Sequence, residues 1–311
     1  MAQFQLYNYQ FGQIKRDAEN DLFPEITGAS PADESFPKRQ DILNEIFRKD
    51  YNHLEKITFT NFSSTKEYTH KHIIPPTDGI IVLRIANKKN RKFTNENFDK
   101  ETKADYPNCI VIIDNRPGIQ RIAIEIRKSV FQNNVVLSKI LQNTLNNVLK
   151  RFSLYLDLMH LQDSKDFWTL IDDKIAYPKG FYKIRFNLPY LNLERLQKKM
   201  DALTKRMRGS YDAKMSLEMT AQQGGQLNFS QNDPTQCAQI NYMMEDQGGN
   251  SIELIPNDNK KKRINVGKTS MKCVVINEPV FVVLAEDAAG NSLFESSALD
   301  NIKQKMKEGI D

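Results

Sequence analysis

The sequence predicts an α+β protein of two domains, each a mostly antiparallel sheet covered by a long amphipathic helix. Three observations support this fold class: a β-rich hairpin pattern at 109–126, an apolar stripe of helical spacing at 134–161, and a strand, helix, strand pattern after residue 180. At 311 residues the chain exceeds the usual size of one core, since domains hold ~100–200 residues. We therefore expect an N-terminal domain at 1–162, a linker at 163–179 and a C-terminal domain at 180–311.

The first elements of the N-terminal domain follow from local patterns. Alternating aromatic residues predict an opening strand, and a Pro/Gly/Ser-containing acidic stretch predicts a loop. Apolar residues at helical spacing then predict a short helix, and two β-rich runs are separated by a Pro-Pro break. In chain order these elements cover 4–11, 17–37, 38–50, 57–62 and 80–85.

The clearest signals of this domain come next. The polar, charged run 88–104 predicts an exposed loop. The runs 109–113 and 119–126 flank Asp114-Asn115-Arg116-Pro117-Gly118, so they predict a hairpin. Apolar residues at steps of three and four predict one continuous helix over 134–161, long enough to cover a sheet.

The C-terminal domain shows the same combination of elements. The alternating run 181–188 predicts a strand that Pro189 ends, and 193–208 predicts an amphipathic helix closed by Gly209. We expect the remaining segments to form a strand, a polar loop, a short helix, further strands and a closing helix. They cover 213–221, 222–233, 237–245, 252–255, 272–285 and 299–307.

Composition excludes several classes of protein. No segment approaches the roughly 20 apolar residues of a transmembrane helix, and the first residues lack the pattern of a signal peptide. Three widely spaced cysteines, Cys109, Cys237 and Cys273, exclude a disulfide framework or a zinc knuckle. We expect a cytoplasmic protein without contact to a membrane. The net charge of +5 is compatible with nucleic-acid binding without being diagnostic.

Two groups of cations are candidates for a nucleic-acid interface. The first lies on the helix 193–208, opposite its apolar stripe, where a band of positive charge could follow phosphates. The second is a charged turn between expected strands. The ten candidate residues are Arg195, Lys198, Lys199, Lys205, Arg206, Lys260, Lys261, Lys262, Arg263 and Lys268. Solvated basic surfaces are common, so an ordinary exposed face is the alternative at both places.

Catalytic and metal-binding patterns are incomplete. Asp114 and Glu125, followed by Arg127 and Lys128, resemble the paired acids of a divalent-metal nuclease, although Arg127 stands where a lysine is expected. His70 and His72 fall on one side of an extended chain, but no cysteine or carboxylate set nearby completes a metal site. No catalytic motif, cofactor or metal is predicted.

The hairpin at 109–126 with its helix, and the strand, helix and strand at 181–221, resemble a loose family of bacterial proteins found beside phage-defence genes. The resemblance lies in apolar spacing and assigns no functional residue. It implies an antiviral setting, with nucleic-acid binding or sensing as the leading hypothesis. The alternatives are an adaptor subunit acting through a protein partner or a second copy, and a metal-dependent nuclease.

Overall fold

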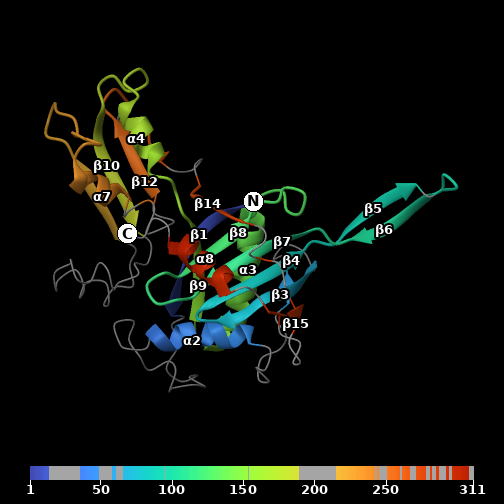
Figure 1. Cartoon of the computed structure of the whole chain (residues 1–311). Coiled ribbons are helices and arrows are strands. Elements are labelled where there is room, and N and C mark those ends of the chain that lie inside the picture. The colour runs from blue at the N-terminus through green and yellow to red at the C-terminus, as the bar shows by residue number, and fades with distance from the viewer. Residues whose placement is uncertain are drawn as a thin grey trace. The chain divides into compact units, whose positions relative to one another are not determined.

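The computed structural model describes fifteen stretches of the chain, and every structural statement below concerns these residues. They are 1–13, 36–48, 58–60, 66–94, 96–152, 154–188, 215–241, 244, 251–259, 261–266, 271–277, 281, 285–286, 292–293 and 296–307. The chain divides into two compact units, Met1–Leu158 with Cys273–Glu308, and Met159–Lys272. Figure 1 shows the elements of both.

An eight-stranded sheet forms the first unit. Seven strands follow the order β14-β1-β8-β7-β4-β3-β2 with antiparallel pairing throughout, and β9 also pairs with β1. The bounds are β1 Ala2–Gln13, β2 Phe59–Thr60, β3 Glu67–Thr77, β4 Ile80–Ala86, β7 Asn108–Asp114, β8 Arg121–Glu125, β9 Leu154–His160 and β14 Cys273–Ile276. The predicted hairpin at 109–126 is confirmed as β7 and β8.

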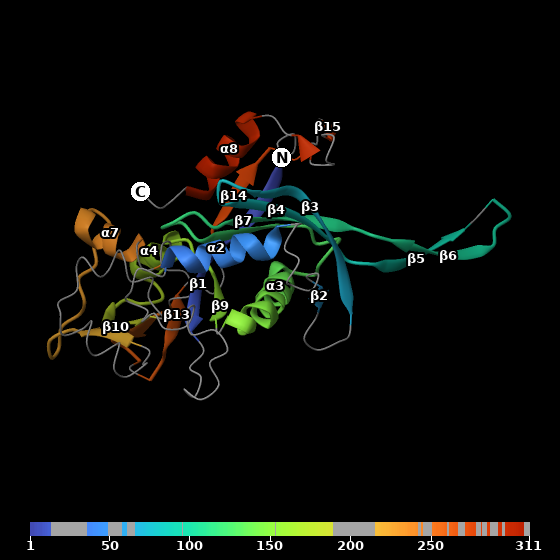
Figure 2. The ribbon, with the colours of Figure 1, turned by 90° about the horizontal axis from the view of Figure 1, so that it is seen from below.

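Helices cover both faces of this sheet. Helices α2 (Phe36–Phe47) and α3 (Asn134–Leu149) lie on one face, and α8 (Ser296–Lys307) lies on the other, as Figure 2 shows. In β4, Ile81, Leu83 and Ile85 join the core under α2 and α3. The intervening even-numbered residues point to the α8 face because side chains alternate along a strand. The sheet is therefore buried on both sides over its central strands.

The predicted helix over 134–161 is only partly correct. It begins as predicted, with the Asn133 side chain accepting the Val136 N–H at 3.0 Å, but it ends at Leu149 and continues only as the 3₁₀ turn η2 (Lys150–Phe152). The next residues form β9, in which Leu154 and Leu156 are buried. The Asn146 side chain bonds both the N–H and the C=O of Leu156, at 2.6 and 3.0 Å, and so fixes the returning strand to the helix.

Two prolines lie inside β3 rather than between strands. Register shifts between His72 and Ile74, and between Ile74 and Thr77, mark irregular pairing here, where missing N–H donors are tolerated. The strand ends in a two-residue turn, Asp78-Gly79, with φ values of 49° and 77°. Positive φ at both central positions is the geometry of a type I′ hairpin turn.

The second unit holds a four-stranded antiparallel sheet in the order β11-β10-β12-β13. Its elements are α4 Lys165–Asp172, β10 Phe181–Leu188, β11 Met215–Thr220, α7 Pro234–Asn241, β12 Ser251–Pro256 and β13 Ile264–Val266. Phe167 and Trp168 of α4 are buried in its core with Ile184 and Leu254. The segment expected as a linker, 163–179, thus contains a helix that packs into this unit.

The mixed α+β fold with antiparallel sheets is confirmed, whereas long helices covering each domain are not. The described helices span at most 16 residues. The closing helix is confirmed as α8, and it belongs with β14 to the first unit, because β14 pairs with β1 at the start of the chain. A short pair, β15 (Ala285–Glu286) and β16 (Ser292–Leu293), precedes it.

Candidate nucleic-acid interface

Most of the predicted cations lie outside the described residues. They are the five cations of the helix predicted at 193–208, which itself lies outside the described residues, together with Lys260 and Lys268. The five are Arg195, Lys198, Lys199, Lys205 and Arg206. Lys261, Lys262 and Arg263 are exposed in the turn between β12 and β13 of the second unit, as predicted for a charged turn. The Lys262 ammonium lies 5.2 Å from the centre of the Tyr177 ring, a cation–π distance.

A second basic element was predicted to be a loop and is a hairpin instead. Strands β5 (Lys89–Thr94) and β6 (Lys100–Asp105) form a two-stranded ribbon, hereafter the arm, which projects beyond the ends of β4 and β7 (Figures 1 and 2). The pairing of β4 with β7 continues into the arm without a shift, through Ala86↔Asn108 and Lys89↔Asp105. The Asn87 N–H donates to Pro107 O at 2.9 Å across the junction.

Contacts at the junction hold the base of the arm to the sheet. Asn87 Nδ2 donates to Val130 O at 2.7 Å, and Lys89 Nζ donates to Ser129 O at 2.6 Å. Lys66 Nζ donates to Asn87 Oδ1 at 2.6 Å. The arm is therefore an extension of two buried strands rather than an unsupported loop, which gives its side chains fixed faces.

One face of the arm carries cations and no carboxylate. Because side chains alternate and cross-strand partners share a face, the pairs Asn90↔Ala104, Lys92↔Thr102 and Thr94↔Lys100 point the same way. Continuing the register adds Lys88 and Tyr106. We call this the lysine face; its residues are Lys88, Asn90, Lys92, Thr94, Lys100, Thr102, Ala104 and Tyr106, all exposed. Within the described part of the chain, no acid pairs with its three lysines.

The opposite face of the arm carries two acids that offset most of the charge of its three cations. We call it the paired face; its residues are Lys89, Arg91, Phe93, Glu101, Lys103 and Asp105. Arg91 Nε lies 2.6 Å from Asp105 Oδ2, and Lys103 Nζ lies 3.1 Å from Glu101 Oε2. The two faces carry similar numbers of cations, but only the paired face also carries acids. The net positive charge of the arm is therefore concentrated on the lysine face.

Two further cations adjoin the base of the lysine face. Lys71 of β3 stands directly opposite Arg84 of β4, and both are exposed. Like charges in a cross-strand pair are destabilising, and neither cation has an acidic partner among the described residues. On the other side of β7, Glu125 is buried and bonded to Arg127 Nε at 3.3 Å and to the Ile110 N–H at 2.8 Å, so its charge is already compensated.

Exposed aromatic side chains occur on the same arm. Phe98, in the turn between β5 and β6, is 87% exposed and has a φ of 61°, a left-handed conformation that is rare for a bulky residue. Phe93 lies on the paired face and Tyr106 on the lysine face, and both are close to half exposed. The aromatic residues are therefore spread over the tip and both faces rather than gathered into one stacking surface.

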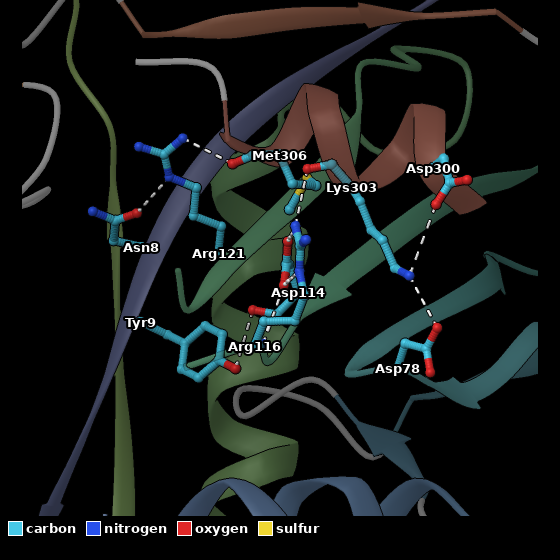
Figure 3. Close-up of polar contacts among 9 residues, drawn as sticks. All are labelled: Asn8, Tyr9, Asp78, Asp114, Arg116, Arg121, Asp300, Lys303 and Met306. Carbon is cyan, nitrogen blue, oxygen red and sulfur yellow. Dashed lines mark hydrogen bonds and ion pairs between the residues drawn. The ribbon is translucent and has the colours of Figure 1, made fainter. Parts of the chain in front are cut away.

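The acids of the nuclease pattern lie apart. Asp114 is fully buried, and Arg116 bonds both of its oxygens, Nε to Oδ1 at 2.9 Å and Nη2 to Oδ2 at 2.6 Å (Figure 3). Asp114 and Glu125 share a sheet face, but their register places them four positions apart, roughly 13 Å. Each is held by an arginine, so the geometry does not bring them to one metal ion.

Polar side chains around Asp114 fix helix α8 instead. Arg116 Nη2 donates to Lys303 O at 2.9 Å, and the buried Arg121 donates from Nη1 to Met306 O at 2.9 Å and from Nε to Asn8 Oδ1 at 3.2 Å (Figure 3). Met306 lies in the last turn of α8, where carbonyls lack intrahelical partners and carry partial negative charge. The two guanidinium groups satisfy that end of α8, so this cluster has a structural role.

His70 and His72 lie on the same side of β3, as predicted, with ring centroids 6.4 Å apart. Their rings pack edge-on against Phe59 and Phe47, respectively. Among the described residues there is no group of three or more side chains suited to holding a metal ion.

Comparisons with known proteins give no relative: no family model, no curated protein and no solved structure matches the chain. A membrane-spanning helix, which would need a long apolar run, does not occur in the described part of the chain.

Proposed function

We propose that the protein binds nucleic acid and that the lysine face of the arm is its main contact surface. The observation that carries this proposal is the separation of charge between the two faces of one ribbon. Lysines on one face lack acidic partners, whereas on the other face Arg91 and Lys103 pair with acids and Lys89 donates to a backbone carbonyl. Unpaired cations in a row attract a polyanion, and binding releases the counterions condensed on it.

The spacing of the lysines and the residues between them support the same proposal. Lys88 and Lys92 are four residues apart on one strand, about 13 Å, and Lys100 stands beside Thr94 on the neighbouring strand. The positions between them hold asparagine, threonine and alanine, which are short and uncharged. A nucleic acid could therefore approach the ribbon backbone while the longer lysine side chains reach phosphates.

Fluorescence anisotropy with labelled DNA and RNA tests the proposal on the full chain. The variant K88Q/K92Q/K100Q removes three charges from the lysine face. The variant R91Q/K103Q/K139Q removes two from the paired face and one from the exposed Lys139 of α3, so the net charges match and Lys89 keeps its bond to Ser129 O. At ~0.15 M salt, losing three phosphate contacts weakens binding by about 100-fold. We expect that loss for the first variant and a change of at most a few-fold for the second.

Equal losses for the two variants would contradict the proposal, since only net charge would then matter. No binding of the unmodified protein to any DNA or RNA at low salt would also contradict it. The remaining hypothesis of an adaptor predicts that an acidic protein co-purifies through the same lysines and is released by salt. The phage-defence setting stays a prediction from the sequence resemblance.

A further inference from the structure

We infer that the ligand of the arm is double-stranded DNA and that the lysine face reads base edges in its major groove. This inference rests on the proposed function and names the form of nucleic acid. The major groove of B-form DNA, about 12 Å wide, admits a two-stranded β-ribbon. The arm is such a ribbon, and no other strand among the described residues pairs with it (Figure 1).

The residue types on the lysine face match those that recognise base edges. Lysine donates to guanine O6 and N7, asparagine bonds adenine through N6 and N7, threonine bonds either, and alanine contacts the thymine methyl group. Apart from Tyr106 at its base, the lysine face consists of these four types. The paired face, in contrast, holds two carboxylates that already pair with Arg91 and Lys103, so those cations are less available to phosphates.

Asn90 is the strongest candidate for specific recognition. It lies between Lys88 and Lys92 along β5, and its cross-strand partner is Ala104. The small partner leaves the Asn90 amide room to approach a base edge, and the flanking lysines can hold the phosphates or guanines on either side. An asparagine that bonds adenine bidentately distinguishes it from the other bases.

Other forms of nucleic acid fit this face less well. The major groove of an A-form RNA duplex is too deep and narrow for side chains to read. Single strands are bound by stacking bases on aromatic side chains. The lysine face has one such residue, Tyr106 at the base, whereas Phe93 points the opposite way and Phe98 lies at the tip.

The inference is tested by measuring binding to a DNA duplex, an RNA duplex of the same sequence and each single strand. We expect the DNA duplex to bind about tenfold or more tightly than the others. Equal or tighter binding of single strands, lost in Phe98→Ala, would overturn the inference in favour of stacking while leaving the proposed function intact. Absence of binding to all of them would overturn both.

Recognition of specific DNA sequences by the lysine face is tested by selecting binding sites from a random duplex library. We expect an enriched motif containing adenine, and we expect Asn90→Ala to reduce the preference for that motif about 5- to 100-fold without weakening binding to unrelated duplexes. Asn147→Ala, an exposed asparagine of α3, is the matched control and should change neither value. Selection that enriches no motif, or a preference unchanged in Asn90→Ala, would contradict base reading by this face.

Discussion

Replacing Arg116 by methionine should strongly destabilise the first unit. The change removes the guanidinium that bonds both oxygens of Asp114, and Asp114 is fully buried. A buried carboxylate left without its partner costs about 3–5 kcal/mol of unfolding free energy. The lost bond to Lys303 O adds to this by leaving a carbonyl of α8 without one of its donors.

The double variant D114N/R116M separates the cost of the unpaired buried charge from the cost of the lost hydrogen bonds. Asparagine keeps the Oδ1 that accepts the Arg116 backbone N–H at 3.1 Å, but it carries no charge. We expect the unfolding free energy of D114N/R116M to lie within about 1–2 kcal/mol of that of the unmodified protein, because replacing a buried ion pair by neutral groups often changes stability little. Urea unfolding followed by far-ultraviolet circular dichroism gives these differences.

The chain provides an internal reference for this experiment. Its one tryptophan, Trp168, is buried in the core of the second unit, so its fluorescence follows that unit. We expect Arg116→Met to leave the fluorescence transition in place while the transition of the first unit moves to lower urea. A loss below about 1 kcal/mol, or a double variant no more stable than the single one, would refute the reasoning about the buried charge.

Three further predictions concern other parts of the first unit. Gly12→Ala should cost about 1–3 kcal/mol in urea unfolding, because its Cβ would overlap with the Tyr155 ring, and unchanged stability would show that the ring moves freely. Burial raises the pKa of the Cys109 thiol to about 12, so a maleimide at about pH 8 should modify Cys109 only in urea, and rapid modification of the native thiol would contradict this. Burial, with a smaller contribution from Asp114, raises the pKa of Tyr9 well above its usual value. The unfolded chain therefore loses this proton first, and the unfolding free energy should fall above about pH 10 by up to about 1.4 kcal/mol per pH unit, whereas an unchanged urea midpoint would argue against it.

The sequence predicted those strands whose alternation or apolar run is strong. The hairpin around Asp114-Asn115-Arg116-Pro117-Gly118 and the closing helix were both found. The 134–161 stripe was extended too far, because Phe152, Tyr155 and Met159 continue the helical spacing, whereas the buried Leu154 and Leu156 follow the period of two of a strand. The pairing of β9 with β1 and the bonds from Asn146 to Leu156 decide for the strand.

The arm was missed because both of its faces are exposed, so no apolar alternation marks it. Its signal was the alternation of charge: Lys88 and Lys92 fall on one parity, and Lys89 and Arg91 fall on the other with their acids across the ribbon. This alternation identifies a charged face only when the pairing register of β5 with β6 is known. That register continues from the pairing of the buried strands β4 and β7. The Asp78-Gly79 turn was a readable hairpin signal that the neighbouring prolines obscured.

The salt dependence of DNA binding tests the central claim most directly. Each phosphate contact on duplex DNA contributes about 0.9 to the slope of the logarithm of the association constant against the logarithm of salt concentration. If Lys88, Lys92 and Lys100 contact phosphates, K88Q/K92Q/K100Q should have a slope shallower by about 2.7 than the unmodified protein. R91Q/K103Q/K139Q should retain nearly the full slope. Parallel lines for K88Q/K92Q/K100Q and the unmodified protein would contradict the claim that these three lysines contact phosphates.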